Sequence, residues 1–85
     1  MINVVIYTKD YCPYCVKAIT LLKKKEVQFK EIDITHDVNL QQEMLEKSEG
    51  RRTVPQIFIN DNPIGGCDDL YNLEASGKLD QLLGK

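Results

Sequence analysis

Two cysteines separated by a Pro-Tyr pair, Cys12 and Cys15, are the side chains of this sequence best suited to covalent chemistry. They follow an apolar run and lead into a helical pattern, and Pro13 suits the first position of a helix, where its missing N–H is not needed. Cys12 is therefore expected at a helix N-terminus, where unpaired backbone N–H groups and the helix dipole stabilise a thiolate. We expect Cys12 to be a nucleophile and Cys15, one turn deeper, to be the less exposed resolving thiol.

Two other roles are open to cysteines at this spacing, and both fit less well. A tetrahedral zinc site needs a second pair of ligands, and only Cys67 and the lone His36 remain. Packing of two small core residues is disfavoured because a helix start after a central strand lies at the carboxyl edge of a sheet, where sites form. We interpret the pair as a redox couple, expect no metal, and interpret His36 as structural or solvated.

Composition narrows the class of protein. The 85 residues allow one domain, residues 1–85, and the 42% hydrophobic and 28% charged fractions are ordinary globular values. The formal net charge is −2, and basic residues are interleaved with acidic ones, so nucleic acid is not expected as a partner. The lack of an obvious apolar seam favours a monomer.

Location follows from what the sequence lacks. No stretch approaches the length of a membrane span, and the opening "MINVVIYT" has neither the basic start nor the long apolar run of a signal peptide. A cytoplasmic location is expected, with no membrane partner. Thiols are kept reduced there, and the odd count of three cysteines argues against a disulfide framework.

The hydrophobic pattern alternates between strand and helix from the start of the chain. Strands are expected at residues 3–8 and 27–34, and a hairpin is expected to begin at or just after Pro55 and to turn at Asp61 and Asn62. Helices are expected at residues 13–25, from the cap Asp37 to residues 48–50, and from residue 67 to Gly77, with a last turn at residues 79–83.

This order indicates an α/β fold. Strand–helix–strand units are expected to pair their strands in parallel with right-handed crossovers, and the final hairpin adds an antiparallel edge. The result is a four-stranded mixed sheet, in the order β-α-β-α-β-β-α, with helices on both faces.

Three motifs resemble one known family. They are "CPYC" at residues 12–15, "TVPQIFI" at residues 53–59 and "GGCDDL" at residues 65–70. Together, on this order of elements, they resemble the dithiol glutaredoxins, the small bacterial type most closely, over residues 4–83. The resemblance implies a thioredoxin-like fold and an oxidoreductase that uses glutathione to reduce protein disulfides and glutathione mixed disulfides.

The resemblance also implies a glutathione site. The Val54–Pro55 bond is expected to be cis, with the backbone of Val54 pairing with the glutathione cysteine. The N–H groups of Cys67 and Asp68 are expected to hold the γ-glutamyl carboxylate while the Asp68 carboxylate meets the ammonium group. Lys9 is expected to take the glycine carboxylate and to favour the Cys12 thiolate.

Further residues near these motifs have less defined roles. Tyr14 is expected to line the groove and Thr53 to hydrogen-bond the tripeptide. One of Arg51 and Arg52 is a candidate for the glycine carboxylate, and the sequence does not say which. Gln56 is a weak candidate. One of the two acids after the paired glycines is expected to cap the helix. Cys67 is either a small buried residue or an oxidisable thiol, and it receives no catalytic step.

Two mechanisms and two rivals follow. Cys12 alone serves a monothiol route through a glutathionyl intermediate, and Cys12 with Cys15 serves a dithiol route through a protein mixed disulfide. The family adds glutathione reductase and NADPH as the regenerating system and ribonucleotide reductase as a possible client. The rivals are a glutaredoxin-like redoxin recharged by thioredoxin reductase, which has no need of "GGCDD" and Lys9, and a module binding an iron–sulfur cluster, which Pro13 disfavours.

Overall fold

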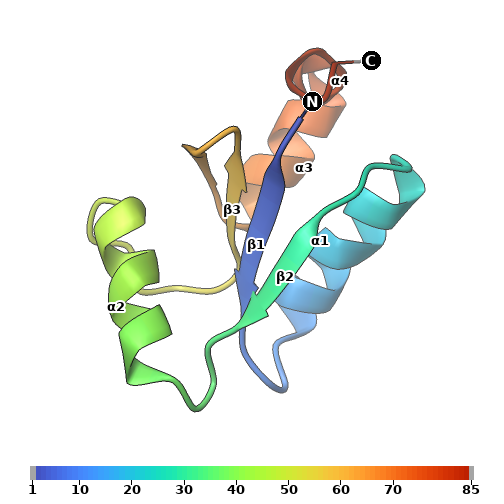
Figure 1. Ribbon diagram of the computed structural model, residues 1–85. Coiled ribbons are helices and arrows are strands. Elements are labelled where there is room, and N and C mark those ends of the chain that lie inside the picture. Colours follow the sequence, from blue (N-terminus) through green and yellow to red (C-terminus); the bar gives the residue numbers. More distant parts are fainter. Residues whose placement is uncertain (1, 85) are drawn as a thin grey trace.

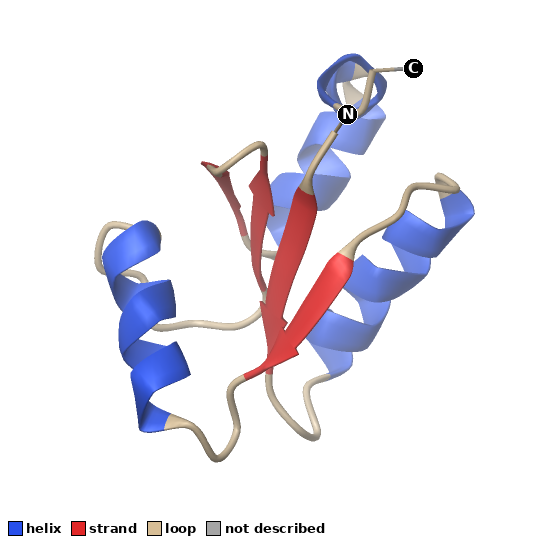
Figure 2. Ribbon diagram, viewed as in Figure 1, coloured by secondary structure: helices blue, strands red, loops and turns tan. Residues whose placement is uncertain are grey.

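The computed structural model describes residues 2–84, which form a four-stranded sheet with helices on both faces (Figure 1; Figure 2). The elements follow the expected alternation, and the C-terminal helical stretch divides into two helices at Gly77. In chain order they are β1 (Val4–Thr8), α1 (Pro13–Lys24), β2 (Lys30–Asp33), α2 (Val38–Lys47), β3 (Gln56–Ile59), β4 (Asn62–Gly65), α3 (Cys67–Ala75) and α4 (Lys78–Leu82).

The strand order in the sheet is β2-β1-β3-β4, with β1 parallel to β2 and antiparallel to β3. The expectation that both strand–helix–strand units pair in parallel is therefore wrong for the second unit. The loop between α2 and β3 carries the chain back to the edge at which β1 ends, so that Gln56 at the start of β3 lies opposite Tyr7 near the end of β1. The handedness rule covers parallel pairs only and does not constrain this connection.

Element boundaries differ from expectation at two places. The second strand begins at Lys30 instead of residue 27, although Val27 still packs against the core. The hairpin turn lies at Asn60 and Asp61, which have positive φ angles of 51° and 67°, instead of at Asp61 and Asn62. Positive φ at two successive positions suits a tight two-residue hairpin, and Asn and Asp tolerate that conformation better than most residues.

The core has two layers, one on each face of the sheet. On one face α1 and α3 cover β1 and β3, and on the other face α2 packs on the sheet by itself (Figure 2). The first layer includes Ala18, Leu22 and Leu70 with Ile6 and Ile57, all fully buried. The second is smaller and consists of Tyr7, Ile34, Met44 and Phe58.

Three connections meet at one end of the sheet, where β1 ends and β3 begins. The chain leaves β1 there for α1, enters β3 there after Pro55, and leaves β4 there for α3, because Gly65 pairs with Ile57 beside the start of β3. The three motifs are thereby brought together from residues 12–15, 53–59 and 65–70.

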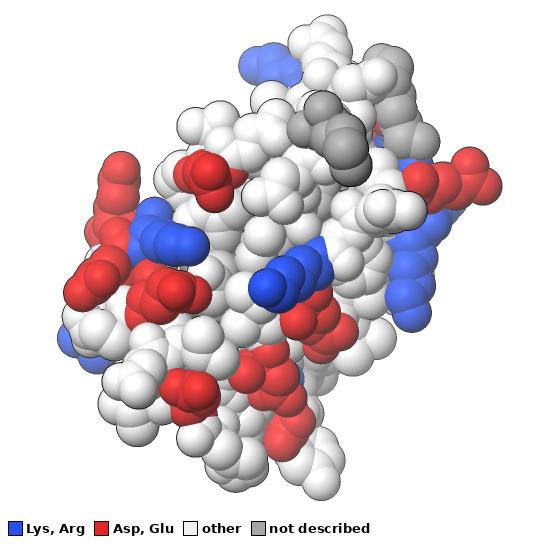
Figure 3. Space-filling view, viewed as in Figure 1, with Lys and Arg blue, Asp and Glu red and all other residues white. Residues whose placement is uncertain are grey.

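Charge is mixed over the face shown in Figure 3, where lysines and arginines stand among aspartates and glutamates. Within residues 2–84, no helix combines the length and the apolar character that crossing a membrane would require.

Candidate active site

The two cysteines occupy the start of α1 as the spacing predicts. Cys12 is the N-cap residue, with φ −111° and ψ 98°, and Pro13 takes the first helical position. The N–H of Cys15 donates to the sulfur of Cys12 at 3.2 Å, so one of the unpaired N–H groups of the helix start is directed at this sulfur. No acidic residue lies in the first turn of α1. A negative charge on Cys12 is therefore favoured by both the hydrogen bond and the helix dipole.

The two thiols differ in exposure, and the pKa of the deeper one is raised. Cys12 is half-buried, whereas Cys15 is 3% exposed, and both are free. Burial, and then the hydrogen bond with Cys12, raises the pKa of Cys15 to about 12. Cys15 is thus a protonated thiol at neutral pH, sitting beneath the accessible sulfur of Cys12, which agrees with the predicted order of nucleophile and resolving thiol.

A groove of about 440 Å³ lies next to the cysteine pair and gathers most of the predicted site. The thiol of Cys12 reaches its wall, donating to the carbonyl oxygen of Val54 at 3.8 Å. Six predicted residues line the groove, namely Tyr14, Thr53, Val54, Pro55, Cys67 and Asp68, together with Arg51, Gly66 and Asp69.

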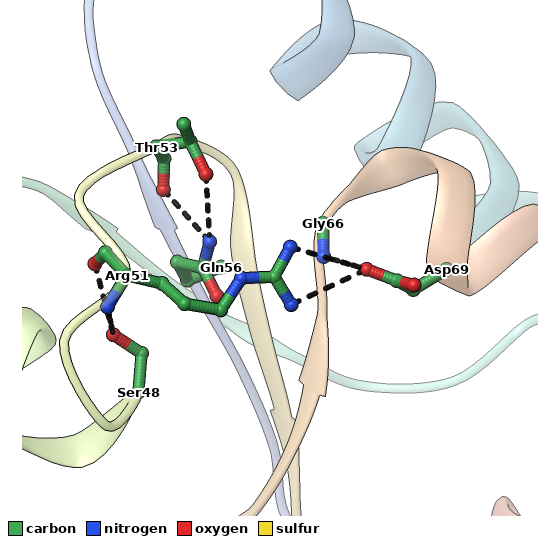
Figure 4. A network of polar contacts seen from close by, with 6 residues as sticks. All are labelled: Ser48, Arg51, Thr53, Gln56, Gly66 and Asp69. Atoms are coloured by element: carbon green, nitrogen blue, oxygen red, sulfur yellow. Dashed lines mark hydrogen bonds and ion pairs between the residues drawn. The ribbon is translucent and has the colours of Figure 1, made fainter.

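The loop that carries Val54 is anchored by a buried glutamine. The Val54–Pro55 bond is cis, as the resemblance implies. Gln56 is 1% exposed, and its side-chain nitrogen donates to the carbonyl oxygen of Thr53 at 2.9 Å and to its hydroxyl at 3.1 Å (Figure 4). The carbonyl and hydroxyl of Thr53 are thereby fixed next to the groove. Gln56, a weak candidate in the sequence, serves here as a support for the loop.

A second anchor holds the other end of this loop. Ser48, buried after α2, donates its hydroxyl to the carbonyl oxygen of Arg51 at 2.9 Å and accepts the N–H of Arg51 at 3.2 Å (Figure 4). The backbone of Arg51 is therefore fixed, and its side chain crosses the groove toward α3. No sequence pattern identified Ser48, because its role depends on a turn that only the folded loop creates.

The opposite wall of the groove is the start of α3. Asp69 accepts the N–H of Gly66 at 2.9 Å, so Asp69 is the capping acid and Asp68 is left exposed toward the groove. Oδ2 of Asp69 also accepts from both terminal nitrogens of Arg51, at 3.3 and 3.4 Å. Gly65, with φ +117°, packs against this pair, since a Cβ there would overlap Oδ2 of Asp69 and lie 2.7 Å from Nη1 of Arg51.

Lys9, the predicted partner of the glycine carboxylate, lies outside the groove. It lines a neighbouring hollow of about 310 Å³, together with Arg52 and residues of α2. The two consecutive arginines are thus divided, with Arg51 on the groove and Arg52 on the hollow.

The third cysteine sits at the first position of α3 and is 7% exposed. Burial raises the pKa of Cys67, with Lys17 opposing the shift and Asp68 adding to it. Cys67 is thus a buried neutral thiol on the groove wall. Within residues 2–84, no group of three or more His, Cys, Asp or Glu side chains is placed to hold a metal ion.

Comparisons with known proteins by sequence and by structure match this chain to one family. A family model described as glutaredoxin matches residues 4–64. The chain is 55% identical to glutaredoxin 3 of Escherichia coli strain K12 over 83 residues, covering 98% of this chain and 99% of that protein. It resembles the solution structure of glutaredoxin from Brucella melitensis, with a TM-score of 0.85, 53% identity, and coverage of 100% and 94% of the two chains. It also resembles buckwheat glutaredoxin in a complex with glutathione, with a TM-score of 0.86, 31% identity, and coverage of 95% and 76%.

Proposed function

This chain belongs to the glutaredoxin family and is a glutathione-dependent thiol-disulfide oxidoreductase with a thioredoxin-like fold, and from that premise we propose the role of each residue in its site. Cys12 is the nucleophile and Cys15 the resolving thiol. The observation that carries this assignment is the contrast within the pair. Cys12 is accessible and accepts a helix N–H, whereas Cys15 is buried with its pKa raised to about 12.

The monothiol route uses Cys12 alone. The Cys12 thiolate attacks the glutathionyl sulfur of a mixed disulfide, the S–S bond breaks, and the client leaves as a thiolate that takes a proton from water. A second glutathione thiolate then attacks the glutathionyl sulfur on Cys12, releasing oxidised glutathione and restoring the Cys12 thiolate. Each step exchanges one S–S bond for another. The route consumes one glutathione thiol and releases one client thiol, and the S–S bond ends in oxidised glutathione.

The dithiol route uses both cysteines. Cys12 attacks a protein disulfide, and Cys15, once deprotonated, attacks the sulfur of Cys12 in the resulting mixed disulfide and releases the reduced client. Two glutathione molecules then reduce the Cys12–Cys15 disulfide. The closeness of the Cys15 N–H to the Cys12 sulfur, 3.2 Å, supports this step because the two residues adjoin at one helix turn.

We assign the groove to glutathione, the reductant of the family. Val54 pairs its backbone with the cysteine of the tripeptide, next to the sulfur of Cys12. The N–H groups of Cys67 and Asp68 hold the γ-glutamyl carboxylate, and the exposed Asp68 carboxylate meets the ammonium group. Thr53 and Tyr14 contact the tripeptide from the loop and from α1. The buckwheat relative is described as a complex with glutathione, which supports this assignment.

Lys9 is assigned to the glycine carboxylate at the opposite end of the tripeptide. Its position on the hollow next to the groove, instead of in it, agrees with a ligand that extends from α3 past Val54 toward the end of β1. Pro55 completes the floor of the groove beside Val54. No metal is part of the proposed reaction.

Clients and setting are further parts of the proposal. We assign disulfide-bonded and glutathionylated proteins as clients, with ribonucleotide reductase as one candidate. The protein is proposed to work in the cytoplasm as a monomer consisting of one domain, residues 1–85.

The test is oxidation of NADPH coupled through glutathione reductase, with glutathione and a small glutathione mixed disulfide as substrates. Wild type and Cys15→Ser are expected to turn over, and Cys12→Ser is expected to be inactive. If wild type is inactive in this assay but is recharged by thioredoxin reductase, the assignment of the groove to glutathione is wrong. If Cys15→Ser is inactive with the small mixed disulfide, the monothiol route is wrong.

A further inference from the structure

The sequence made one of Arg51 and Arg52 a candidate for binding the glycine carboxylate of the tripeptide. The position of Arg51 in the structure does not fit that end of the ligand. Its backbone is fixed by Ser48, and its side chain reaches across the groove to α3, where it lies against Gly65 and Gly66 (Figure 4). Lys9 and Arg52 line the other hollow, to which the proposed function assigns the glycine carboxylate. Of the lysines and arginines in residues 2–84, Arg51 is the one that lines the groove.

Asp69 keeps Arg51 on this side. Both terminal nitrogens of the guanidinium face Oδ2 of Asp69, at 3.3 and 3.4 Å, and the same oxygen accepts the N–H of Gly66. A planar guanidinium held by two of its nitrogens has a defined direction. The side chains of Arg51 and Asp69 are 48% and 45% exposed, so the guanidinium remains accessible to a ligand.

The α3 end of the groove therefore carries charges of both signs. Arg51 supplies a cation that also pairs with Asp69, the N–H groups at the start of α3 supply donors for an anion, and Asp68 supplies a second carboxylate. This set complements a zwitterion in which a carboxylate and an ammonium group share one carbon atom. A ligand end with a lone carboxylate would leave Asp68 without a counter-charge.

We propose that Arg51, positioned by Asp69, is a specificity-determining residue that recognises the α-carboxylate of the γ-glutamyl end of glutathione, and not its glycine carboxylate. The inference rests on the proposed binding of glutathione in this groove. In this arrangement Asp69 is a positioning residue, since it acts on the ligand through Arg51.

The test uses mixed disulfides between a tripeptide and 2-nitro-5-thiobenzoate, whose release is followed by absorbance. The tripeptides are glutathione, an analogue with 4-aminobutyrate in place of the γ-glutamyl residue, which lacks the α-carboxylate, and an analogue with a glycine carboxamide. All proteins carry Cys15→Ser, so that the transfer of the tripeptide to Cys12 is measured alone, and the protein with only this change is the wild-type reference of the test. The variants are Arg51→Gln, Asp69→Asn, the double variant, and Arg52→Gln as the matched control.

Arg51→Gln is expected to slow the reaction with glutathione about fivefold, a modest loss because the charges are partly exposed. With the aminobutyrate analogue, Arg51→Gln is expected to make no difference, because the group that it recognises is missing. With the glycine carboxamide the fivefold loss is expected to remain. Arg52→Gln is expected to keep the wild-type preference for glutathione over the aminobutyrate analogue.

Asp69→Asn separates positioning from capping, because an asparagine oxygen still accepts the N–H of Gly66 while the charge that holds Arg51 is lost. It is expected to slow the reaction with glutathione about threefold and to add nothing in the Arg51→Gln background. Additive losses would overturn the positioning role.

Two outcomes overturn the role of Arg51 in recognition. One is a loss in Arg51→Gln that persists with the aminobutyrate analogue and disappears with the carboxamide, which would place Arg51 at the glycine end. The other is an Arg51→Gln variant that matches wild type with all three tripeptides. Failure of the proposed function has a different signature: the wild type would react equally fast with glutathione and with a cysteine mixed disulfide that lacks both ends.

Discussion

Two helices begin at the same end of the sheet, each with a cysteine at its start, and the surroundings of the two cysteines differ. At α1 the N-cap is Cys12 itself, half-buried, with an N–H directed at its sulfur and no acid in the first turn. At α3 the N-cap is Gly66, Cys67 follows as a buried residue, and two acids occupy the first turn.

The difference shows that a helix N-terminus does not by itself activate a cysteine. Both helices present unpaired N–H groups and the positive end of a dipole. At α3 the Asp69 carboxylate already takes the N–H of Gly66, and burial with nearby Asp68 raises the pKa of Cys67. At α1 the sulfur of Cys12 is the group that receives the N–H. In the proposed site, one helix start serves the chemistry and the other serves the binding of the ligand.

The largest expected effect comes from replacing Cys12 and Cys67 by serine, one at a time. Cys12→Ser should lower turnover at least about a thousandfold, because a serine hydroxyl is not ionised at neutral pH and does not form the mixed disulfide. Cys67→Ser, which keeps the backbone N–H, should stay within about threefold of wild type. The coupled NADPH assay measures both. Comparable losses in the two variants would show that the starts of α1 and α3 are not chemically distinct.

The packing at the start of α3 can be disturbed by a substitution that changes no reactive side chain. Gly65→Ala places a Cβ against the Arg51–Asp69 pair at a φ of +117°, and it should lower the free energy of unfolding by about 2 to 3 kcal/mol. Gly50→Ala is the matched control, since Gly50 also has a positive φ, +95°, but a Cβ there meets nothing within 4 Å.

Urea denaturation followed by circular dichroism gives both free energies. Gly50→Ala should cost only about 1 kcal/mol, the conformational part alone. Equal losses in the two variants would mean that the packing of Gly65 against Asp69 and Arg51 does not matter.

Much of the site could be predicted from the sequence because its parts are local. The cap at Cys12, the helix position of Pro13 and the burial of Cys15 follow from residues within one turn of each other, and the structure confirms them. The α/β class follows from the periodicity of the segments. The thioredoxin-like fold came from the family resemblance instead, and the comparison with the Brucella melitensis structure confirms it.

Other features depend on contacts between distant segments, and the sequence could not reveal them. Arg51 and Asp69 are 18 residues apart, and nothing in either segment indicates that they pair. The antiparallel direction of β3 follows from the path of the loop after α2, which no periodicity describes. The strand expected from residue 27 begins only at Lys30, although Val27 and Phe29 are still packed against the core, so apolar alternation indicated burial more reliably than strand pairing.

The second thiol at the α1 start gives a prediction about pH. The pKa of Cys15 is raised from 9.0 to about 12 in the folded protein, so its contribution to stability is complete below pH 9 and is lost as the pH rises toward 12. Between those values the unfolded chain releases a proton that the folded chain keeps, and stability falls by about 1.4 kcal/mol per pH unit for one such group. Unfolding by urea at pH 8, 9 and 10 measures this slope.

Cys15→Ala should flatten the decline between pH 9 and 10 by about 1 kcal/mol. Part of the slope should persist, because the pKa values of Cys67 and Tyr7 are raised as well. Should Cys15→Ala leave the slope unchanged, Cys15 would not be the protonated partner of Cys12.

The smallest effect concerns the charges around Cys67, which adjust a pKa that is raised mainly by burial. Lys17 lowers and Asp68 raises the pKa of Cys67, while burial has the largest influence. In a Cys12→Ser, Cys15→Ser background, Lys17→Met should slow the alkylation of Cys67 by iodoacetamide about twofold and Asp68→Asn should speed it about twofold, since exposed charges are screened by water and salt. Mass spectrometry of the alkylated protein over time at pH 8 gives the rates.

If the two variants change the alkylation rate by small and similar factors in opposite directions, burial and not charge accounts for the difference between Cys67 and Cys12. A large acceleration in Asp68→Asn would show instead that the first-turn acid alone prevents α3 from activating its cysteine.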